Sequence, residues 1–340
     1  MNGVPLAFWE HLCDITRTLS NARKLSGYYG DLAELEYRYS SYYQAFVSNG
    51  VESRRYLTHY SSNDYVYAPE EIEATPKKFV EFLMINLIDG HDESVSRELV
   101  QRFPYSKHQF AFSSKAISET SIDFMYSLKK IAALVITTQL DDESIRRLQK
   151  LVTGLKLFEL LVYEPACQEG GLTGTLKSLL CQDQFQELAI RCYVKIPWRS
   201  GIVRELLHFW SEHAQEMRGK NLFFERCCEG GVDQLEEFIL HRDASKSDLG
   251  IEEALEVCSQ EECDFINWEY CHNNERYTKP SCVYKFEEGE GEQRRRLYIS
   301  FECKHEEEGN TEIRWGPASC SGRDNLGLMR ATELLHVLFA

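Results

Sequence analysis

Cysteine and histidine residues gather between positions 258 and 282 and offer the first candidate chemistry in the chain. They are Cys258, Cys263, Cys271, His272 and Cys282. Thiolates and imidazoles are the usual ligands of structural zinc, but such sites contain tight Cys-x-x-Cys pairs. Cys258 and Cys263 are separated by four residues instead, and no pair in the cluster has the tight spacing. We therefore expect free thiols, buried or half-exposed, and no metal site.

Acidic residues, histidines and catalytic motifs offer no stronger candidate. The run Asp141-Asp142-Glu143 could bind a cation, but a helix that starts after Asp141 explains it, because acids stabilise the positive end of a helix. His208 and His213 are five residues apart, which is off the spacing that lets two helical residues share a ligand. The sequence contains no Gly-rich phosphate loop, no His-Glu-x-x-His and no Gly-x-Ser-x-Gly. We expect no catalytic residues and no cofactor, although groups from distant segments could still converge.

Composition limits the classes of partner. The net charge of −16 over 340 residues argues against nucleic acid, because phosphate contacts need clustered Lys and Arg. No apolar run approaches the roughly 20 residues that span a bilayer, and Glu10, Asp14 and Arg17 interrupt any secretory signal. Twelve cysteines without such a signal indicate reduced thiols. We expect a cytoplasmic or nuclear protein that binds neither nucleic acid nor membrane.

A six-residue phrase, apolar-x-x-apolar-x-apolar, recurs along the middle of the chain. It occurs at Ile131–Ile136, Leu157–Val162 and Phe185–Ile190, with a degenerate copy at Gly219–Phe224. Successive central leucines lie 26, 28 and 34 residues apart, which are lengths similar to those of leucine-rich repeats. Each copy predicts a strand. The predicted strand residues are Leu134, Ile136, Leu160, Val162, Leu188, Ile190, Leu222 and Phe224.

The segments between these phrases have apolar stripes with helical spacing. One stripe starts at Ile145, another at Val203 and a third at Val232, and Ser118 and Asp141 are predicted N-caps. Alternating helices and strands predict an α/β fold, an irregular leucine-rich-repeat-like solenoid over residues 77–245. Regular repeats have an Asn or Cys that bonds the turn after each strand. Here only one copy has such a residue, Cys227, so the repeats are irregular.

The two ends of the chain differ from the repeats. Residues 1–60 are rich in tyrosine and are expected to be helical, and a polar, proline-containing boundary follows. Residues 250–340 are expected to form a C-terminal cap. Alternation predicts a β-hairpin from strands at 282–287 and 297–303, and we expect residues 332–339 to form a short helix.

The N-terminal segment has a Val-Pro start, spaced aliphatic residues, a Leu-Ser pair and then an aromatic residue. The residues that carry this pattern are Val4, Pro5, Leu6, Phe8, Leu12, Ile15, Leu19, Leu25, Ser26, Tyr29 and Leu32. It resembles the F-box, although Val4 stands where Leu is usual and Tyr29 where Trp is usual. Together with the repeats and the C-terminal hairpin, the chain looks like the large nematode families of F-box and FTH-type proteins.

The resemblance implies a substrate-recognition adaptor of a cullin-type ubiquitin ligase. In that interpretation residues 4–32 dock a Skp-type adaptor, and the repeats hold a target protein of unknown identity. The alternative is a leucine-rich-repeat-like binding or scaffold protein with no ubiquitin-ligase role, in which residues 4–32 cap the repeats. Both interpretations predict a non-catalytic protein-interaction module.

Overall fold

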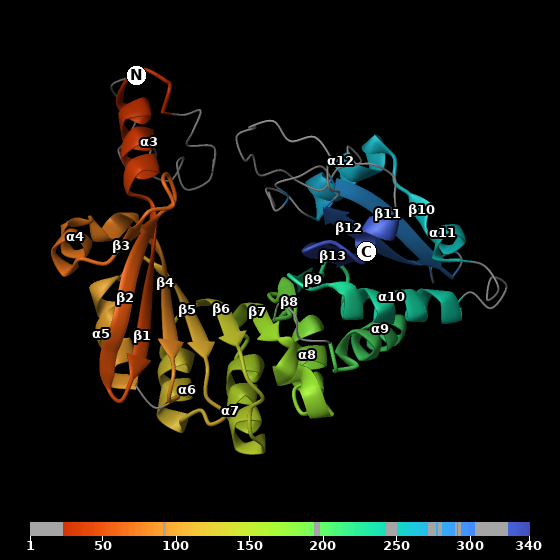
Figure 1. The fold of residues 1–340 in the computed structure, drawn as a ribbon, viewed down its shortest axis with the longest axis horizontal. Coiled ribbons are helices and arrows are strands. Elements are labelled where there is room, and N and C mark those ends of the chain that lie inside the picture. Colours follow the sequence, from red (N-terminus) through yellow and green to blue (C-terminus); the bar gives the residue numbers. More distant parts are fainter. Residues whose placement is uncertain are drawn as a thin grey trace. The chain divides into compact units, whose positions relative to one another are not determined.

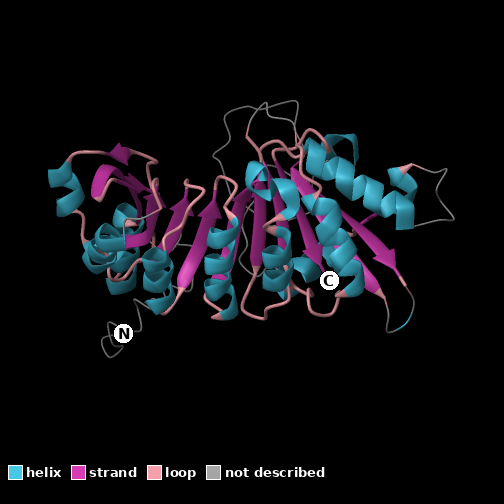
Figure 2. Ribbon diagram, turned by 90° about the horizontal axis from the view of Figure 1, so that it is seen from below, coloured by secondary structure: helices cyan, strands magenta, loops and turns pink. Residues whose placement is uncertain are grey.

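The computed structural model describes residues 23–90, 93–193, 198–242, 250–270, 277, 281–289, 291, 294–302 and 326–340. The chain divides into two compact units, unit 1 (Met1–Ala132) and unit 2 (Ala133–Ala340). The described residues form ten α-helices and thirteen β-strands, which alternate through much of the chain (Figure 1, Figure 2). This alternation confirms the predicted α/β class and its helix–strand units. Among the described residues, no helix has the length and apolar composition needed to cross a membrane.

Unit 1 is built on a mixed sheet in the order β5-β4-β1-β2-β3. The strands β1, β4 and β5 are parallel to one another, and β2 pairs antiparallel with both β1 and β3. The elements are α3 (Tyr28–Tyr39), β1 (Ser41–Ser48), β2 (Val51–His59), β3 (Tyr65–Val66), α4 (Pro69–Ala74), the 3-10 helix η1 (Lys77–Phe79), β4 (Val80–Leu87), α5 (Glu93–Arg102), β5 (Lys107–Phe112) and α6 (Glu119–Ser127).

The prediction that residues 1–60 are helical is wrong for residues 41–59, which form the β1–β2 hairpin. Burial alternates along β1, with Tyr43, Ala45 and Val47 fully buried and their neighbours partly exposed. The hairpin turns at Asn49-Gly50, where both residues have positive φ (52° and 73°). Asn-Gly is the preferred pair for a two-residue turn of this kind, because its backbone twist matches that of the strands.

Unit 2 contains parallel strands in chain order, followed by antiparallel ones. Their order is β6-β7-β8-β9-β13-β12-β11-β10, and β6 begins just before the boundary between the units. The elements are β6 (Ile131–Ile136), α7 (Asp142–Thr153), β7 (Leu157–Tyr163), η2 (Glu164–Gly170), α8 (Thr173–Leu180), β8 (Glu187–Arg191), α9 (Ile202–Glu212), β9 (Asn221–Glu225), α10 (Glu229–Arg242), α11 (Ile251–Ala254), β10 (Glu256–Val257), α12 (Gln260–Glu269), β11 (Ser281–Glu288), β12 (Arg295–Glu302), η4 (Leu326–Met329) and β13 (Leu334–Phe339).

The four recurring phrases overlap β6, β7, β8 and β9, with β8 and β9 starting two residues later than their phrases. The eight strand residues named from the sequence are at most 1% exposed, so they form the core of unit 2 and are not available to a partner. The two predicted N-caps are confirmed. Ser118 accepts a hydrogen bond from the Ser121 N–H, and Asp141 accepts one from the Ser144 N–H at 2.7 Å.

Residues 334–339 form a strand, so the predicted short helix at 332–339 is wrong. β13 lies between β9 and β12 and is antiparallel to both. Side chains on both of its faces are buried, including His336 and Val337. A continuous apolar run is compatible with either a buried helix or a buried strand, so periodicity could not distinguish them.

The segments predicted as a C-terminal hairpin are strands β11 and β12, which pair antiparallel with Phe286 opposite Leu297. Cysteines here and elsewhere in the described residues are mostly free thiols. Cys282 is the exception, because it is bonded in a disulfide. The expectation of reduced thiols is therefore wrong at this position.

Candidate functional site

The sheet of unit 1 has one face lined with aromatic side chains that remain partly exposed. The strand register places Tyr42 beside Thr58 and Phe82, and it places Tyr65 beside Thr58 on the same face. Residues at alternate positions of these strands share this direction. The surface, here called the aromatic face, consists of Tyr42, Phe46, Tyr56, Tyr65, Tyr67 and Phe82.

The opposite face of this sheet is closed by helices. Tyr43 is fully buried there, and its ring lies 4.5 Å from that of Phe103, which follows α5. Phe110 meets Phe124 of α6 in an edge-on contact at 6.2 Å. Arg102 of α5 pairs with Glu73 of α4 and so ties those two helices together. The helices therefore bury the apolar side chains of this face, and the core of unit 1 forms without covering the aromatic face.

Four rings of the aromatic face form a cluster. Tyr56 is at its centre, with ring centroids 5.3 Å from Tyr65, 5.9 Å from Tyr67 and 6.3 Å from Phe46. The rings of Tyr65 and Tyr67 are 6.3 Å apart and within 18° of parallel. Both tyrosines are more than half exposed, at 59% and 55%. Such mutual contacts restrict the rings and prepare them for binding.

Two cations lie over rings of this face. Arg54 lies over the Phe46 ring at 5.4 Å, and Lys107 lies over the Phe82 ring at 5.1 Å. Burial raises the pKa of the Tyr42 and Tyr56 hydroxyls above the ordinary value, with a further increase for Tyr56 from Tyr65. These phenols are therefore neutral near pH 7, and the Tyr56 hydroxyl donates to the side-chain oxygen of Gln44.

This arrangement is suited to binding. Tyrosines supply large, rigid and amphipathic contact area at a low entropic cost. The sequence signals were the Asn49-Gly50 turn and tyrosines two residues apart at Tyr65 and Tyr67. Because residues 1–60 are predicted to be helical, the sequence alone does not predict that these residues share one face of a sheet.

The residues of the F-box-like pattern are described only in part. Val4, Pro5, Leu6, Phe8, Leu12, Ile15 and Leu19 lie outside the described residues. Leu25 is 57% exposed, and Ser26 is also exposed, just before α3. Tyr29 is half-buried and Leu32 is buried, both in α3. A Cβ at Gly30 would lie 1.8 Å from the Leu25 carbonyl oxygen, so the turn into α3 requires glycine there.

Ser300, His336 and Asn221 form a chain of side-chain hydrogen bonds within unit 2. Ser300 Oγ lies 3.4 Å from His336 Nδ1, and His336 Nε2 lies 2.9 Å from Asn221 Oδ1. Tyr277 donates to Ser300 at 2.8 Å. Ser300 and His336 are only 3% and 4% exposed. We interpret this array as a satisfied polar network of the core, because a substrate would have to displace packed side chains to reach Ser300.

No group of three or more His, Cys, Asp or Glu side chains in the described parts of the chain is placed to hold a metal ion. Two members of the predicted thiol cluster, Cys258 and Cys263, are buried in an apolar cluster with Ile266 and Val283. Burial raises the pKa of the Cys258 thiol to about 12, so the thiol is protonated near neutral pH. Protonated thiols are poor metal ligands and poor nucleophiles.

Comparison of the chain with protein-family models, with curated proteins and with solved structures finds no match.

Proposed function

We propose that this chain is a non-catalytic protein-interaction module whose aromatic face holds an extended segment of a partner protein. The observation that carries the proposal is the contrast between the two faces of the unit 1 sheet. Tyr43 and its neighbours are closed off by helices, whereas Tyr65 and Tyr67 are more than half exposed. An exposed apolar surface in a folded protein commonly marks an interface.

The charge of the surface determines the kind of segment. Arg54 and Lys107 flank the rings, so an extended segment with acidic side chains complements the face. Tyrosine rings also pack well against the backbone and proline rings of extended peptides. The partner is therefore an acidic, extended segment.

The repeats and the N-terminal segment suggest the role of a ubiquitin-ligase adaptor for this module. The order β7-β8-β9 follows the chain, the pairs are parallel, and a helix connects each strand to the next. These features support an irregular leucine-rich-repeat-like solenoid. The F-box-like residues between Val4 and Leu32 would dock a Skp-type adaptor, so that the bound partner becomes the substrate of a cullin-type ubiquitin ligase. The alternative is the same binding module with no role in ubiquitin transfer.

The experiment is a selection of acidic extended peptides, displayed on phage, against the full-length chain. Binding of the selected peptides is then measured for the double variant Tyr65→Ala/Tyr67→Ala. We expect affinity to fall by about tenfold or more, because both rings are anchors of the surface. The matched control is Tyr126→Ala, which removes a 40% exposed tyrosine of α6, a helix that packs on the opposite face of the sheet.

Peptides that bind the double variant and the original chain equally well would refute the assignment to the aromatic face. The same conclusion would follow if Tyr126→Ala weakened binding to the same extent. Circular dichroism spectra that match the original protein would show that the double variant is folded.

A further inference from the structure

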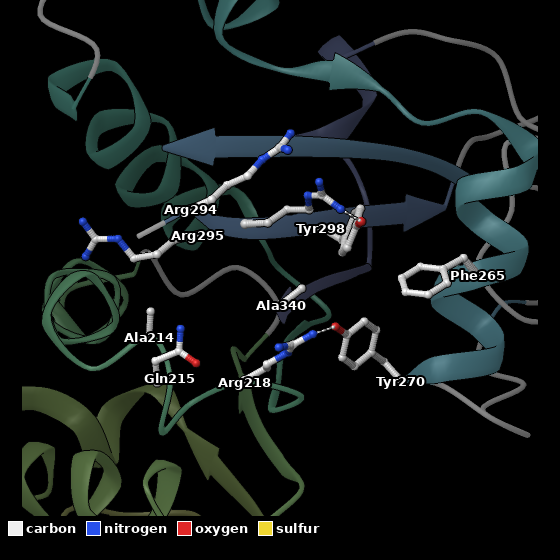
Figure 3. Close-up of a pocket in the computed structure, with 10 residues that line it drawn as sticks. Ala214, Gln215, Arg218, Phe265, Tyr270, Arg294, Arg295, Tyr298 and Ala340 are labelled. Carbon is white, nitrogen blue, oxygen red and sulfur yellow. Dashed lines mark hydrogen bonds between the residues drawn. The ribbon is translucent and has the colours of Figure 1, made fainter. Parts of the chain in front are cut away.

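A pocket in unit 2 has cationic and aromatic walls that the proposed function does not use (Figure 3). Its volume is about 220 Å³. The charged and aromatic side chains that line it include Arg218, Phe265, Tyr270, Arg294, Arg296 and Tyr298, and we call it the arginine pocket. With Arg295, four arginines line it, and its described lining contains no Asp or Glu side chain. This is a local reversal of sign in a chain with a net charge of −16.

Arg218 has the most N–H donors available for a ligand. Its guanidinium donates to the Tyr270 hydroxyl at 3.3 Å and makes no ion pair within 4.0 Å with any described carboxylate. Figure 3 shows these two side chains next to each other on one wall. A guanidinium carries five N–H donors in a planar fork, so most of the Arg218 donors are available to a ligand.

The other arginines contribute excess positive charge. Arg294 and Arg296 both pair with the carboxylate of Glu287, so in the described part of the chain two cations share a single anion. Arg296 also donates to the Tyr298 hydroxyl at 2.5 Å. Arg295 pairs with Glu288 at 3.3 Å, and Glu288 also pairs with Arg242. Among the described residues, the guanidinium groups therefore outnumber the carboxylates that pair with them.

Aromatic rings form the remaining wall. Phe265 projects from α12, is 46% exposed and lies 6.2 Å from Tyr270 in an edge-on contact at 87°. In Figure 3 the rings of Phe265, Tyr270 and Tyr298 lie on one side of the pocket. A ligand that suits this site combines a flat apolar ring with a compact, multiply charged anion. The ring would pack on the aromatic wall, and the anion would meet the guanidinium groups.

We propose that the arginine pocket binds a phosphorylated tyrosine side chain of a partner protein. The phosphate accepts hydrogen bonds from Arg218 and Arg294, whose planar forks match phosphate oxygens. The phenyl ring lies against Phe265 and Tyr270. This inference deepens the proposed function, because it gives the bound protein a second contact and makes capture depend on phosphorylation.

The test uses the full-length chain and short peptides of Gly, Ser and Ala around a central phosphotyrosine, phosphoserine or unmodified tyrosine. Binding is measured by isothermal titration calorimetry at low salt. We expect only the phosphotyrosine peptide of the three to bind. We expect Arg218→Ala to lower its affinity by about tenfold or more. The matched control is Arg146→Ala, which removes an arginine of α7 whose side chain is 72% exposed.

Several results would overturn the proposal. These are no binding of the phosphotyrosine peptide, equal binding of the phosphoserine peptide, or equal losses in Arg218→Ala and Arg146→Ala. A preference for vesicles of anionic lipid over the phosphotyrosine peptide would also overturn it. Because the peptide carries no acidic residues, its binding should persist in Tyr65→Ala/Tyr67→Ala. Failure of this inference and failure of the aromatic-face proposal are therefore separate results.

Discussion

At the scale of single residues, a buried carboxylate replaces the turn-bonding asparagine that the repeats lack. Glu164 follows β7 directly and is fully buried. Its Oε1 accepts hydrogen bonds from the backbone N–H groups of Arg199 and Ser200, at 2.7 and 2.6 Å. Gln168 donates to Oε2 at 3.2 Å. One side chain therefore fixes the approach to α9, some 35 residues further along the chain.

We predict that Glu164→Ala destabilises the protein by about 2–4 kcal/mol, because it leaves buried backbone donors without a partner. Glu164→Gln keeps an acceptor oxygen, so its free energy of unfolding should fall by clearly less. Urea denaturation followed by circular dichroism measures both variants. Equal losses for Ala and Gln, or none for Ala, would show that the carboxylate does not hold this loop.

At the scale of elements, a buried lysine closes the connection from α8 to β8. Lys220 precedes β9 and is 6% exposed. Its Nζ donates to the carbonyl oxygens of Gln182 and Phe185, both at 2.7 Å, and of Asp183 at 3.1 Å. Burial lowers the pKa of this ammonium group from its ordinary value. The carbonyl groups therefore offset a real cost of desolvation.

We predict that Lys220→Met destabilises the protein by about 2–3 kcal/mol, since the side chain keeps its length but the carbonyl oxygens lose their donor. The control is Lys177→Met in α8, which removes a half-exposed ion pair with Glu205 at 3.6 Å and a cation–π contact with the Phe209 ring at 5.8 Å. That change should cost at most about 1 kcal/mol. A midpoint of urea unfolding shifted equally in the two variants would contradict the prediction.

At the scale of the whole molecule, the net charge conceals local surfaces of the opposite sign. Arg54 and Lys107 on the aromatic face and Arg218 in the arginine pocket lie in a chain with a net charge of −16. We predict that these local clusters favour acidic or phosphorylated protein partners. Salt should weaken both interactions, because exposed charges are screened.

The proposed adaptor docking is tested at the scale of the whole chain. We predict that the full chain co-purifies with a Skp-type adaptor and that removal of residues 1–22 abolishes this. A deletion to residue 60 would also remove β1 and β2, so only the shorter deletion tests docking. Leu25→Glu should weaken docking, while Leu155→Glu, an equally exposed leucine of unit 2, should not. If the intact chain fails to bind the adaptor, the binding module without a ligase role is favoured.

The sequence by itself determined the elements whose signal is local. The recurring phrases located β6 to β9, the apolar stripes located α7, α9 and α10, and Ser118 and Asp141 were recognised as N-caps. Each of these signals lies within a few residues, where side-chain periodicity and capping report the backbone directly. The α/β class follows from the same signals.

Only the tertiary structure decided how distant segments pair and which side chains they expose. β13 lies between β9 and β12, although more than a hundred residues separate it from β9. Tyr42, Tyr56 and Tyr65 share one face because of the way β1, β2 and β3 pair, and a shift of that pairing by one residue would have turned side chains to the opposite face. Arg218 likewise meets Tyr270 only in the folded chain. Such contacts depend on long-range pairing, which no local pattern encodes.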